Sequence, residues 1–90
     1  MTFLYFGIII KVMLKKFVII EMRQIMQNLS EREKIVLKFL VEGIDNKHIG
    51  ENLNISIHTV KSYIANILRK FEAKNRTQVA FIAGKNNIVE

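Results

Sequence analysis

Residues 54–71, NISIHTVKSYIANILRKF, constrain the fold of this chain more than any other stretch. Apolar residues recur there every three or four positions, which is the spacing of one face of an α-helix. These apolar residues are Val60, Ile64, Ile67, Leu68 and Phe71. The opposite face is short, polar and basic, and it carries Lys61, Ser62, Ala65, Asn66 and Arg69. The pattern predicts a helix that buries one side in a core and keeps the other side in solvent.

A shorter helix is expected directly before this one. Asp45 is a favourable N-cap for it, with Ile49 and Leu53 as its core contacts, and Asn54 tolerates the left-handed conformation that ends a helix. Ser56 then caps the helix over residues 57–71. About three turn residues separate the two helices, which is the spacing of a helix-turn-helix.

Two further helices are predicted on either side of this pair. Ser30 and Glu33 have the spacing of a capping box, and Gly43 can end a helix, so one helix is predicted over about residues 31–42. Its apolar stripe is expected to contain Ile35, Val36, Phe39 and Leu40. The last helix is predicted to begin between Asn75 and Thr77 and to end at Gly84. It has more apolar surface than one side needs, which leaves simple packing and a subunit contact as equal alternatives.

Length, composition and charge limit the class of protein. Ninety residues, 50% of them apolar and none of them cysteine, suit one small domain without disulfides. The formal net charge is +6. Residues 55–85 carry six basic groups and one acidic group, whereas residues 30–54 carry four basic and five acidic groups. A polyanion such as DNA is therefore the first partner to consider.

No residue pattern points to an enzyme, a cofactor or a metal site. The chain has no cysteine nucleophile, no glycine-rich phosphate loop and no carboxylate pair with a reason to share a cleft. His48 and His58 are expected on different helices without further ligands, so no metal ion is expected there. His58 is instead expected near the start of the long helix, within reach of a phosphate. No small-molecule substrate is evident, and the absence of cysteine suits the reducing cytoplasm.

Residues 1–28 form an apolar N-terminal extension ahead of the domain expected over residues 29–90. The extension shows neither a clean helical nor an alternating period. Lys11, Lys15 and Lys16 interrupt it near its middle, so neither a membrane span nor a secretory signal is expected. Two equal interpretations remain: a short strand or helix that covers an apolar surface or pairs two subunits, or upstream sequence translated from a start called too early. The later starts would be Met13, Met22 and Met26.

Residues 29–80 resemble the DNA-binding domain of LuxR-type, also called GerE-type, transcription regulators. Four motifs carry the resemblance: LSERE and EG at the two ends of the helix over 31–42, IS followed by TVKSY on the long helix, and NRTQ at the start of the last helix. The promoter-reading region of sigma factors is the nearest rival, but it does not usually continue into NRTQ and a fourth helix. The resemblance implies an all-α, four-helix helix-turn-helix domain and a bacterial transcription regulator.

The resemblance also implies roles for individual residues, because the third helix of this family enters the DNA major groove. Lys61, Ser62 and Ala65 become the base-facing residues, with Asn66 on the same stripe. Ser56, Thr59 and Arg69 are then expected near phosphates, and Lys47 and Arg76 are flanking supports. The last helix of the family commonly forms a dimer contact, which here would use Val79, Ile82 and Ala83. The implied partners are double-stranded DNA and a second copy of the chain, and RNA polymerase is a candidate.

The chain departs from the family pattern in a few places. His48–Gly50 reads HIG where EIA is usual, and a glycine inside a helix costs roughly 1 kcal/mol against alanine. Ala65 stands where a polar residue is common, so base readout is expected to rest on Lys61 together with methyl contacts to thymine. Relatives usually carry a separate receiver or ligand-binding domain. A remnant or output domain of a longer response regulator is therefore an alternative, as is a membrane-surface or protein-interaction module built on residues 3–20.

Overall fold

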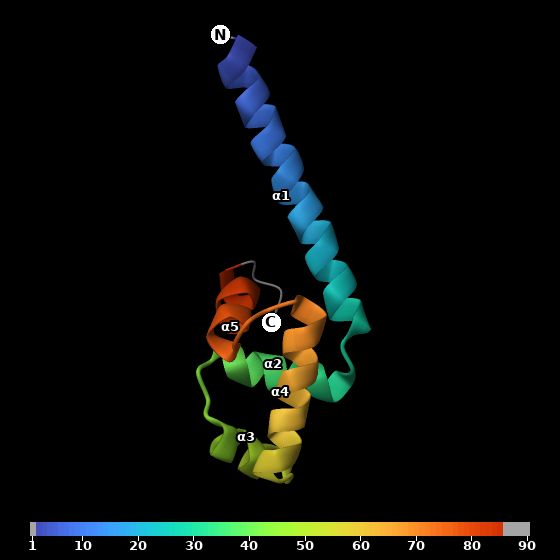
Figure 1. Ribbon diagram of the computed structural model, residues 1–90, viewed down its shortest axis with the longest axis vertical. Helices are drawn as coiled ribbons and strands as arrows, with labels where there is room; N and C mark the ends of the chain where they lie inside the picture. The colour runs from blue at the N-terminus through green and yellow to red at the C-terminus, as the bar shows by residue number, and fades with distance from the viewer. Residues whose placement is uncertain (1, 86–90) are drawn as a thin grey trace.

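The regular structure of this chain is entirely α-helical in the computed structural model, which describes residues 2–85 (Figure 1). Five helices follow one another: α1 Thr2–Asn28, α2 Glu31–Val41, α3 Asn46–Leu53, α4 Ile57–Phe71 and α5 Arg76–Lys85. Within α1, side chains are described at residues 7, 9, 10, 13 and 14 and from residue 20 onward. The predicted all-α fold is confirmed, and the four helices expected after residue 29 are α2 to α5.

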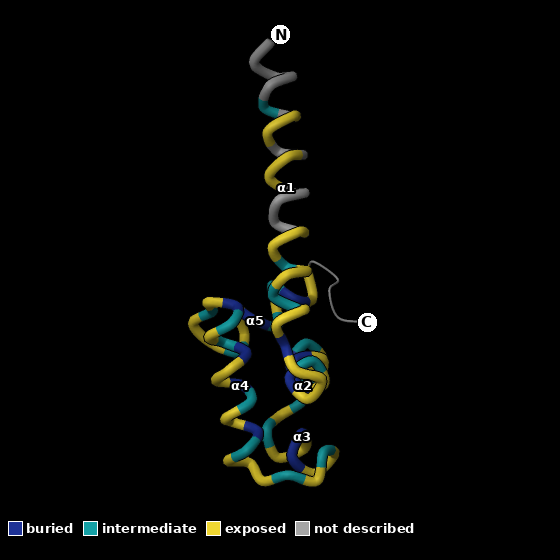
Figure 2. Tube along the Cα trace, turned by 90° about the vertical axis from the view of Figure 1, so that its right-hand side faces the viewer, coloured by how far each residue is buried: buried dark blue, intermediate teal, exposed yellow. Residues whose placement is uncertain are grey.

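Helices α2 to α5 enclose one small apolar core. α2 packs against both α4 and α5, and α3 packs against α4 (Figures 1 and 2). The core residues come from all four helices and from the residue after α1: Leu29, Val36, Leu37, Leu40, Ile49, Val60, Ile64, Ile67, Phe71, Val79 and Ala83. Because α4 contacts several neighbours, its remaining face is held in a fixed orientation.

Helices α3 and α4 form the predicted helix-turn-helix. The Asp45 carboxylate accepts a hydrogen bond from the His48 backbone N–H at 2.9 Å, and Ser56 Oγ accepts one from the Thr59 backbone N–H at 3.1 Å. Asn54 ends α3 in the left-handed conformation, with φ of 56°. Both caps and the turn residue are therefore as predicted.

Gly50 allows α3 to approach the turn closely. A Cβ at this position would lie 2.8 Å from the carbonyl oxygen of Ile55, a backbone atom of the turn. The Ile55 N–H also donates a hydrogen bond to the Gly50 carbonyl at 2.9 Å. Alanine at position 50 would therefore require a backbone shift, even though it favours the helical conformation.

Helix α2 begins as predicted but buries a different stripe. Ser30 and Glu33 form the reciprocal capping box, and Gly43 follows the helix with φ of 77°. Ile35, expected in the core, is 42% exposed, whereas Leu37 is fully buried. The expected stripe was wrong at these two positions because α2 contacts α4 and α5 together, which turns Val36 and Leu37 inward.

The N-terminal extension is one continuous helix of 27 residues, which is longer than the short strand or helix that was one of the two interpretations. Its last turns cover the domain, where Met22, Ile25 and Met26 are partly buried against the core. Lys70 Nζ donates a hydrogen bond to the Asn28 carbonyl at 2.9 Å, and Leu29 is buried. The remainder of α1 projects away from the other helices (Figure 1), and the longest extent of the molecule is 58 Å.

No helix within residues 2–85 combines the length and the apolar character needed to cross a membrane.

Candidate nucleic-acid interface

The outer face of α4 is a polar, exposed surface of the domain. Val60, Ile64, Ile67 and Phe71 are buried, and Leu68 is partly buried. All the residues predicted for the opposite face are exposed: Lys61, Ser62, Ala65, Asn66 and Arg69. The predicted division of α4 into a core face and a solvent face is confirmed.

The side chains on this face are short apart from its two cations. Ser62 Oγ donates a hydrogen bond to the His58 carbonyl at 3.3 Å, so its hydroxyl is held against the helix backbone. Arg69 reaches Asn66 Oδ1 at 3.5 Å, the limit of a hydrogen bond. Lys61 takes part in no interaction found among the described residues, so its ammonium is available to a partner.

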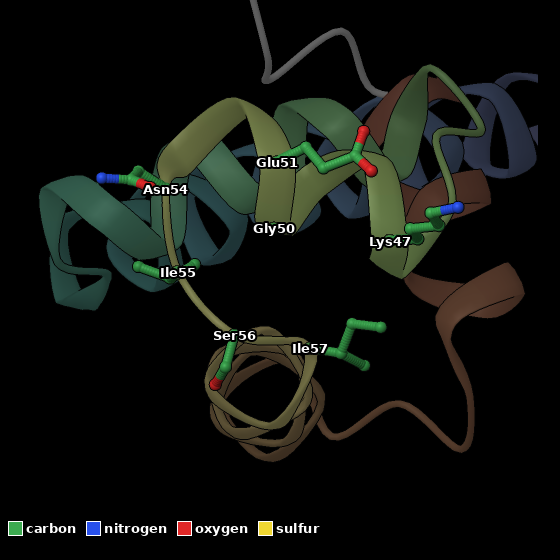
Figure 3. A pocket seen from close by; sticks show the side chains of 7 residues that line it. All are labelled: Lys47, Gly50, Glu51, Asn54, Ile55, Ser56 and Ile57. Carbon is green, nitrogen blue, oxygen red and sulfur yellow. The ribbon is translucent and has the colours of Figure 1, made fainter.

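The N-terminus of α4 borders a shallow groove at the turn (Figure 3). Its lining comes from α3, the turn and the first residue of α4: Lys47, Gly50, Glu51, Asn54, Ile55, Ser56 and Ile57. The Ser56 and Thr59 hydroxyls lie 3.0 Å apart, and Ser56 also caps the helix, so both have structural roles. Lys47 and His58 are exposed at this end of the motif.

Arg76 has a clear intramolecular role. Its guanidinium donates hydrogen bonds to the Ile44 carbonyl and to Asn46 Oδ1, both at 2.6 Å. These bonds tie the start of α5 to the segment between α2 and α3. Arg76 therefore positions the domain's own helices, and a DNA contact would have to use its remaining N–H groups.

Lys70 is one of the six basic groups of residues 55–85, and it also has a structural role. Its Nζ lies 2.8 Å from Glu33 Oε1, where it forms an ion pair with a carboxylate that is 5% exposed. Burial raises the pKa of Glu33, but hydrogen bonds from Lys70 and Ser30 outweigh burial and hold this pKa below its ordinary value of 4.5. Lys70 thus joins α4 to α2 and, through Asn28, to α1. Sequence spacing could not reveal a contact between residues so far apart in the chain.

The residues predicted for a dimer contact lie on α5, and two of the three are buried. Val79 and Ala83 are fully buried in the chain's own core, so neither offers surface to a second copy. Ile82 is partly buried. Phe81 is 65% exposed, with Lys85 Nζ 5.7 Å from the centre of its ring. Phe81, which the sequence pattern did not single out for a subunit contact, is thus a large apolar side chain that α5 leaves exposed.

The two histidines lie apart from any cluster of ligands. His48 Nδ1 shares a hydrogen bond with Asp45 Oδ1 at 2.6 Å, beside the cap of α3. Hydrogen bonds from the His48 backbone and ring lower the pKa of Asp45. Across residues whose side chains are described, no three of His, Cys, Asp and Glu come close enough to hold a metal ion.

These elements define a helix-turn-helix domain with an exposed second helix. Residues 27–83 match the family described as bacterial regulatory proteins, luxR family. The match covers most of the chain and spans α2 to α4 with most of α5, and the chain belongs to the luxR family of bacterial regulatory proteins. The resemblance found in the sequence is thereby confirmed.

Individual relatives agree with this assignment. The chain is similar to the transcriptional regulatory protein LiaR of Bacillus subtilis (strain 168), with 46% identity over 63 residues, or 70% of this chain and 30% of LiaR. It is 34% identical over 67 residues to the response regulator protein VraR of Staphylococcus aureus (strain NCTC 8325 / PS 47), covering 74% of this chain and 32% of VraR. The chain thus spans about a third of the length of these relatives.

Proposed function

We propose that this chain is a sequence-specific DNA-binding transcription regulator that reads the major groove with α4. The observation that carries the proposal is the exposed, basic face of a helix whose other face is locked in the core. The major groove is about 12 Å wide and admits one α-helix of about 10–12 Å diameter. The small side chains at Ser62 and Ala65 permit close approach of the helix to base edges.

The residues of the interface divide into two kinds of contact. Lys61 is the principal base reader, since lysine donates to guanine O6 and N7, and Ala65 offers a methyl contact to thymine. Ser62 and Asn66 lie beside them on the same face. Phosphate contacts are assigned to polar groups at the ends of α4 and on its neighbours, of which Thr59 and Arg76 are partly buried: Lys47, Ser56, His58, Thr59, Arg69 and Arg76. Such contacts set affinity and its salt dependence, and they carry no sequence information directly.

The proposed function implies partners and a location. Double-stranded DNA is the proposed ligand, and the cytoplasm is the proposed location. The protein is proposed to bind paired half-sites as a homodimer, and RNA polymerase is a candidate partner. The family membership and the absence of catalytic patterns support a regulator without enzymatic activity. Because the chain spans about a third of the length of its relatives, we further propose that it acts as an output domain of the kind found in response regulators.

Selection from a random duplex DNA library at near-physiological salt tests this function. The purified protein is expected to enrich a sequence that contains two regularly spaced half-sites. If the protein retains all DNA sequences equally, and this retention falls steeply with added salt, then it binds DNA only through its positive charge. That result would refute sequence-specific recognition. A variant with Lys61→Ala and Ser62→Ala is the matched control, because it should retain the fold and lose the enrichment.

A further inference from the structure

Ile57, the first residue of α4, is a large apolar side chain that the domain leaves exposed. It is 46% exposed, and it belongs neither to the buried core nor to the partly buried side chains around the core. All side chains of α2 to α5 are described, and two other large apolar residues are exposed there, Ile35 on α2 and Phe81 on α5. Within the helix-turn-helix, Ile57 is therefore the large apolar residue that remains open to a partner.

The place of Ile57 on α4 extends the proposed reading face toward the start of the helix. Residues four apart form one row along a helix surface, so Ile57, Lys61 and Ala65 lie in one row. Lys61 and Ala65 carry the proposed base contacts. A rise of about 1.5 Å per residue places Ile57 about 6 Å from Lys61 along the helix axis, or about two base-pair steps of 3.4 Å. The N-terminal residues of a recognition helix contact base edges in helix-turn-helix proteins, so Ile57 is in place to meet a further base pair.

The groove at the turn surrounds Ile57 with groups that face DNA in the proposed complex. Ile57 lines this groove together with Lys47 of α3 and the cap residue Ser56, both of which are assigned to phosphates. Figure 3 shows the Ile57 side chain extending into the space between α4 and Lys47, while the Glu51 carboxylate points away from Ile57. Phosphate binding by Lys47 and Ser56 would bring Ile57 against the duplex and remove its side chain from water.

The charges around Ile57 favour a nucleic acid over an apolar protein surface. Lys47 lies across the groove and Lys61 lies one turn along α4, both are exposed, and neither ammonium forms a hydrogen bond or ion pair within the described part of the chain. One isoleucine between two such cations is far smaller than a protein–protein interface, which buries about 800 Å² on each partner. DNA satisfies both kinds of group, because phosphates pair with lysine and thymine presents an apolar C5-methyl group in the major groove.

We propose that Ile57 is a further specificity-determining residue, which contacts the C5-methyl group of a thymine about two base pairs from the pair that Lys61 reads. This inference rests on the proposed function and adds to it a preference for thymine at one position of each half-site. Cytosine at that position lacks the methyl group and presents its N4 amino group, which an apolar side chain leaves without a hydrogen bond. Cytosine should therefore be disfavoured there.

Exchange of thymine for deoxyuridine tests this contact, because it removes the methyl group and leaves the hydrogen-bonding edge of the base unchanged. Fluorescence anisotropy measures the affinity of the full chain for the selected duplex and for duplexes with one thymine position exchanged in each half-site. At one position the exchange should weaken binding by about four- to fifteenfold, the range for losing one or two buried methyl contacts. In Ile57→Ala, the same exchange at that position should change the affinity by less than about twofold, because the side chain that meets the methyl group is gone.

Two further variants serve as controls for Ile57→Ala. Ile35→Ala shortens an isoleucine of similar exposure, 42%, on α2 and outside the proposed interface, so its response to each exchange should equal that of the wild type. Ile57→Val keeps a branched apolar side chain and should retain most of the response. Thermal unfolding by circular dichroism should place the melting temperature of Ile57→Ala within about 4 °C of the wild type, since Ile57 lies outside the buried core.

Retention of the full thymine preference by Ile57→Ala at every position would overturn the inference, because Ala65 or another residue would then meet the methyl group. An equal loss of affinity for all duplexes, with a melting temperature lowered by more than about 4 °C, would also overturn it, since Ile57 would then act through the fold. Either result on an enriched operator leaves the proposed function standing. If the selection enriches no sequence, the proposed function fails and this inference fails with it.

Discussion

Lys61 lies on the exposed face of α4, about one turn beyond the Ser56 cap, and none of its atoms contributes to the core. Lys61→Ala should weaken binding to the selected DNA by about 1–3 kcal/mol, or about 5- to 150-fold, because it removes a base contact. The midpoint of thermal unfolding should stay within about 2 °C of the wild type, since surface substitutions seldom exceed 0.5 kcal/mol. Fluorescence anisotropy titration and thermal unfolding by circular dichroism measure the two quantities.

Lys38→Ala is the matched control for Lys61, since it removes an exposed lysine of α2 from outside the proposed interface. It should lower the affinity for specific and random DNA by similar small factors. A loss of several degrees of thermal stability in Lys61→Ala would show that the assigned outer face of α4 is wrong.

Gly50 offers a second test at a single position. Gly50→Ala should lower the free energy of unfolding by about 1 kcal/mol, and the melting temperature by about 4–8 °C, because the clash with the Ile55 carbonyl exceeds the gain in helix propensity. Gly84→Ala is the control: its Cβ would lie 3.5 Å from Val41 Cγ1, an ordinary contact, so it should not destabilise α5. A higher melting temperature for Gly50→Ala would mean that the turn relaxes readily.

Some residue-level features could be predicted and others could not. Caps depend on local hydrogen bonds, so Ser30, Asp45 and Ser56 were identified from spacing alone. Leu37 is buried in the core where the sequence pattern favoured Ile35. This difference depends on how α4 and α5 pack against α2. Such an arrangement is a tertiary property, and a single helical stripe does not contain it.

At the scale of helices, the Glu33–Lys70 ion pair joins α2, α4 and the end of α1. The pKa of Glu33 is lowered in the folded chain, so its carboxylate stabilises the fold above about pH 4.5, and this contribution is lost as the pH falls through the lowered value. Glu33→Gln should reduce the free energy of unfolding at pH 7 by about 1–3 kcal/mol. In this variant the free energy of unfolding should also decrease less than in the wild type as the pH falls below about 4.5. Urea unfolding over a pH series measures both effects.

The control for Glu33 is Glu31→Gln in the same helical turn, where the Glu31 side chain is 88% exposed. It should change stability at pH 7 by less than about 0.5 kcal/mol. An unchanged acid dependence in Glu33→Gln would exclude this carboxylate as a source of acid sensitivity.

The existence of the helices could be predicted better than their partners. α2 to α5 have caps, stops and a 3.6-residue period, and their bounds agree closely with expectation. α1 has apolar residues all around, so a search for one apolar stripe found no period.

At the scale of the whole molecule, the family could be inferred from sequence, and so could the helix proposed to face DNA, because local motifs carry both. The subunit contact expected at Val79 and Ala83 could not be judged before the core was known, since apolar residues serve cores and interfaces alike. The described structure thus has two parts: a folded domain whose α4 has an exposed polar face, and a projecting helix with exposed apolar side chains.

The junction between α1 and α2 has a consequence for the direction in which α1 projects. Only Leu29 and Ser30 separate α1 from α2, Leu29 is buried, and Lys70 holds the Asn28 carbonyl. These contacts leave α1 little freedom to turn against the domain. Whatever binds to α1 is therefore held in a set direction relative to α4, so the junction turns a contact on α1 into a constraint on how α4 is presented.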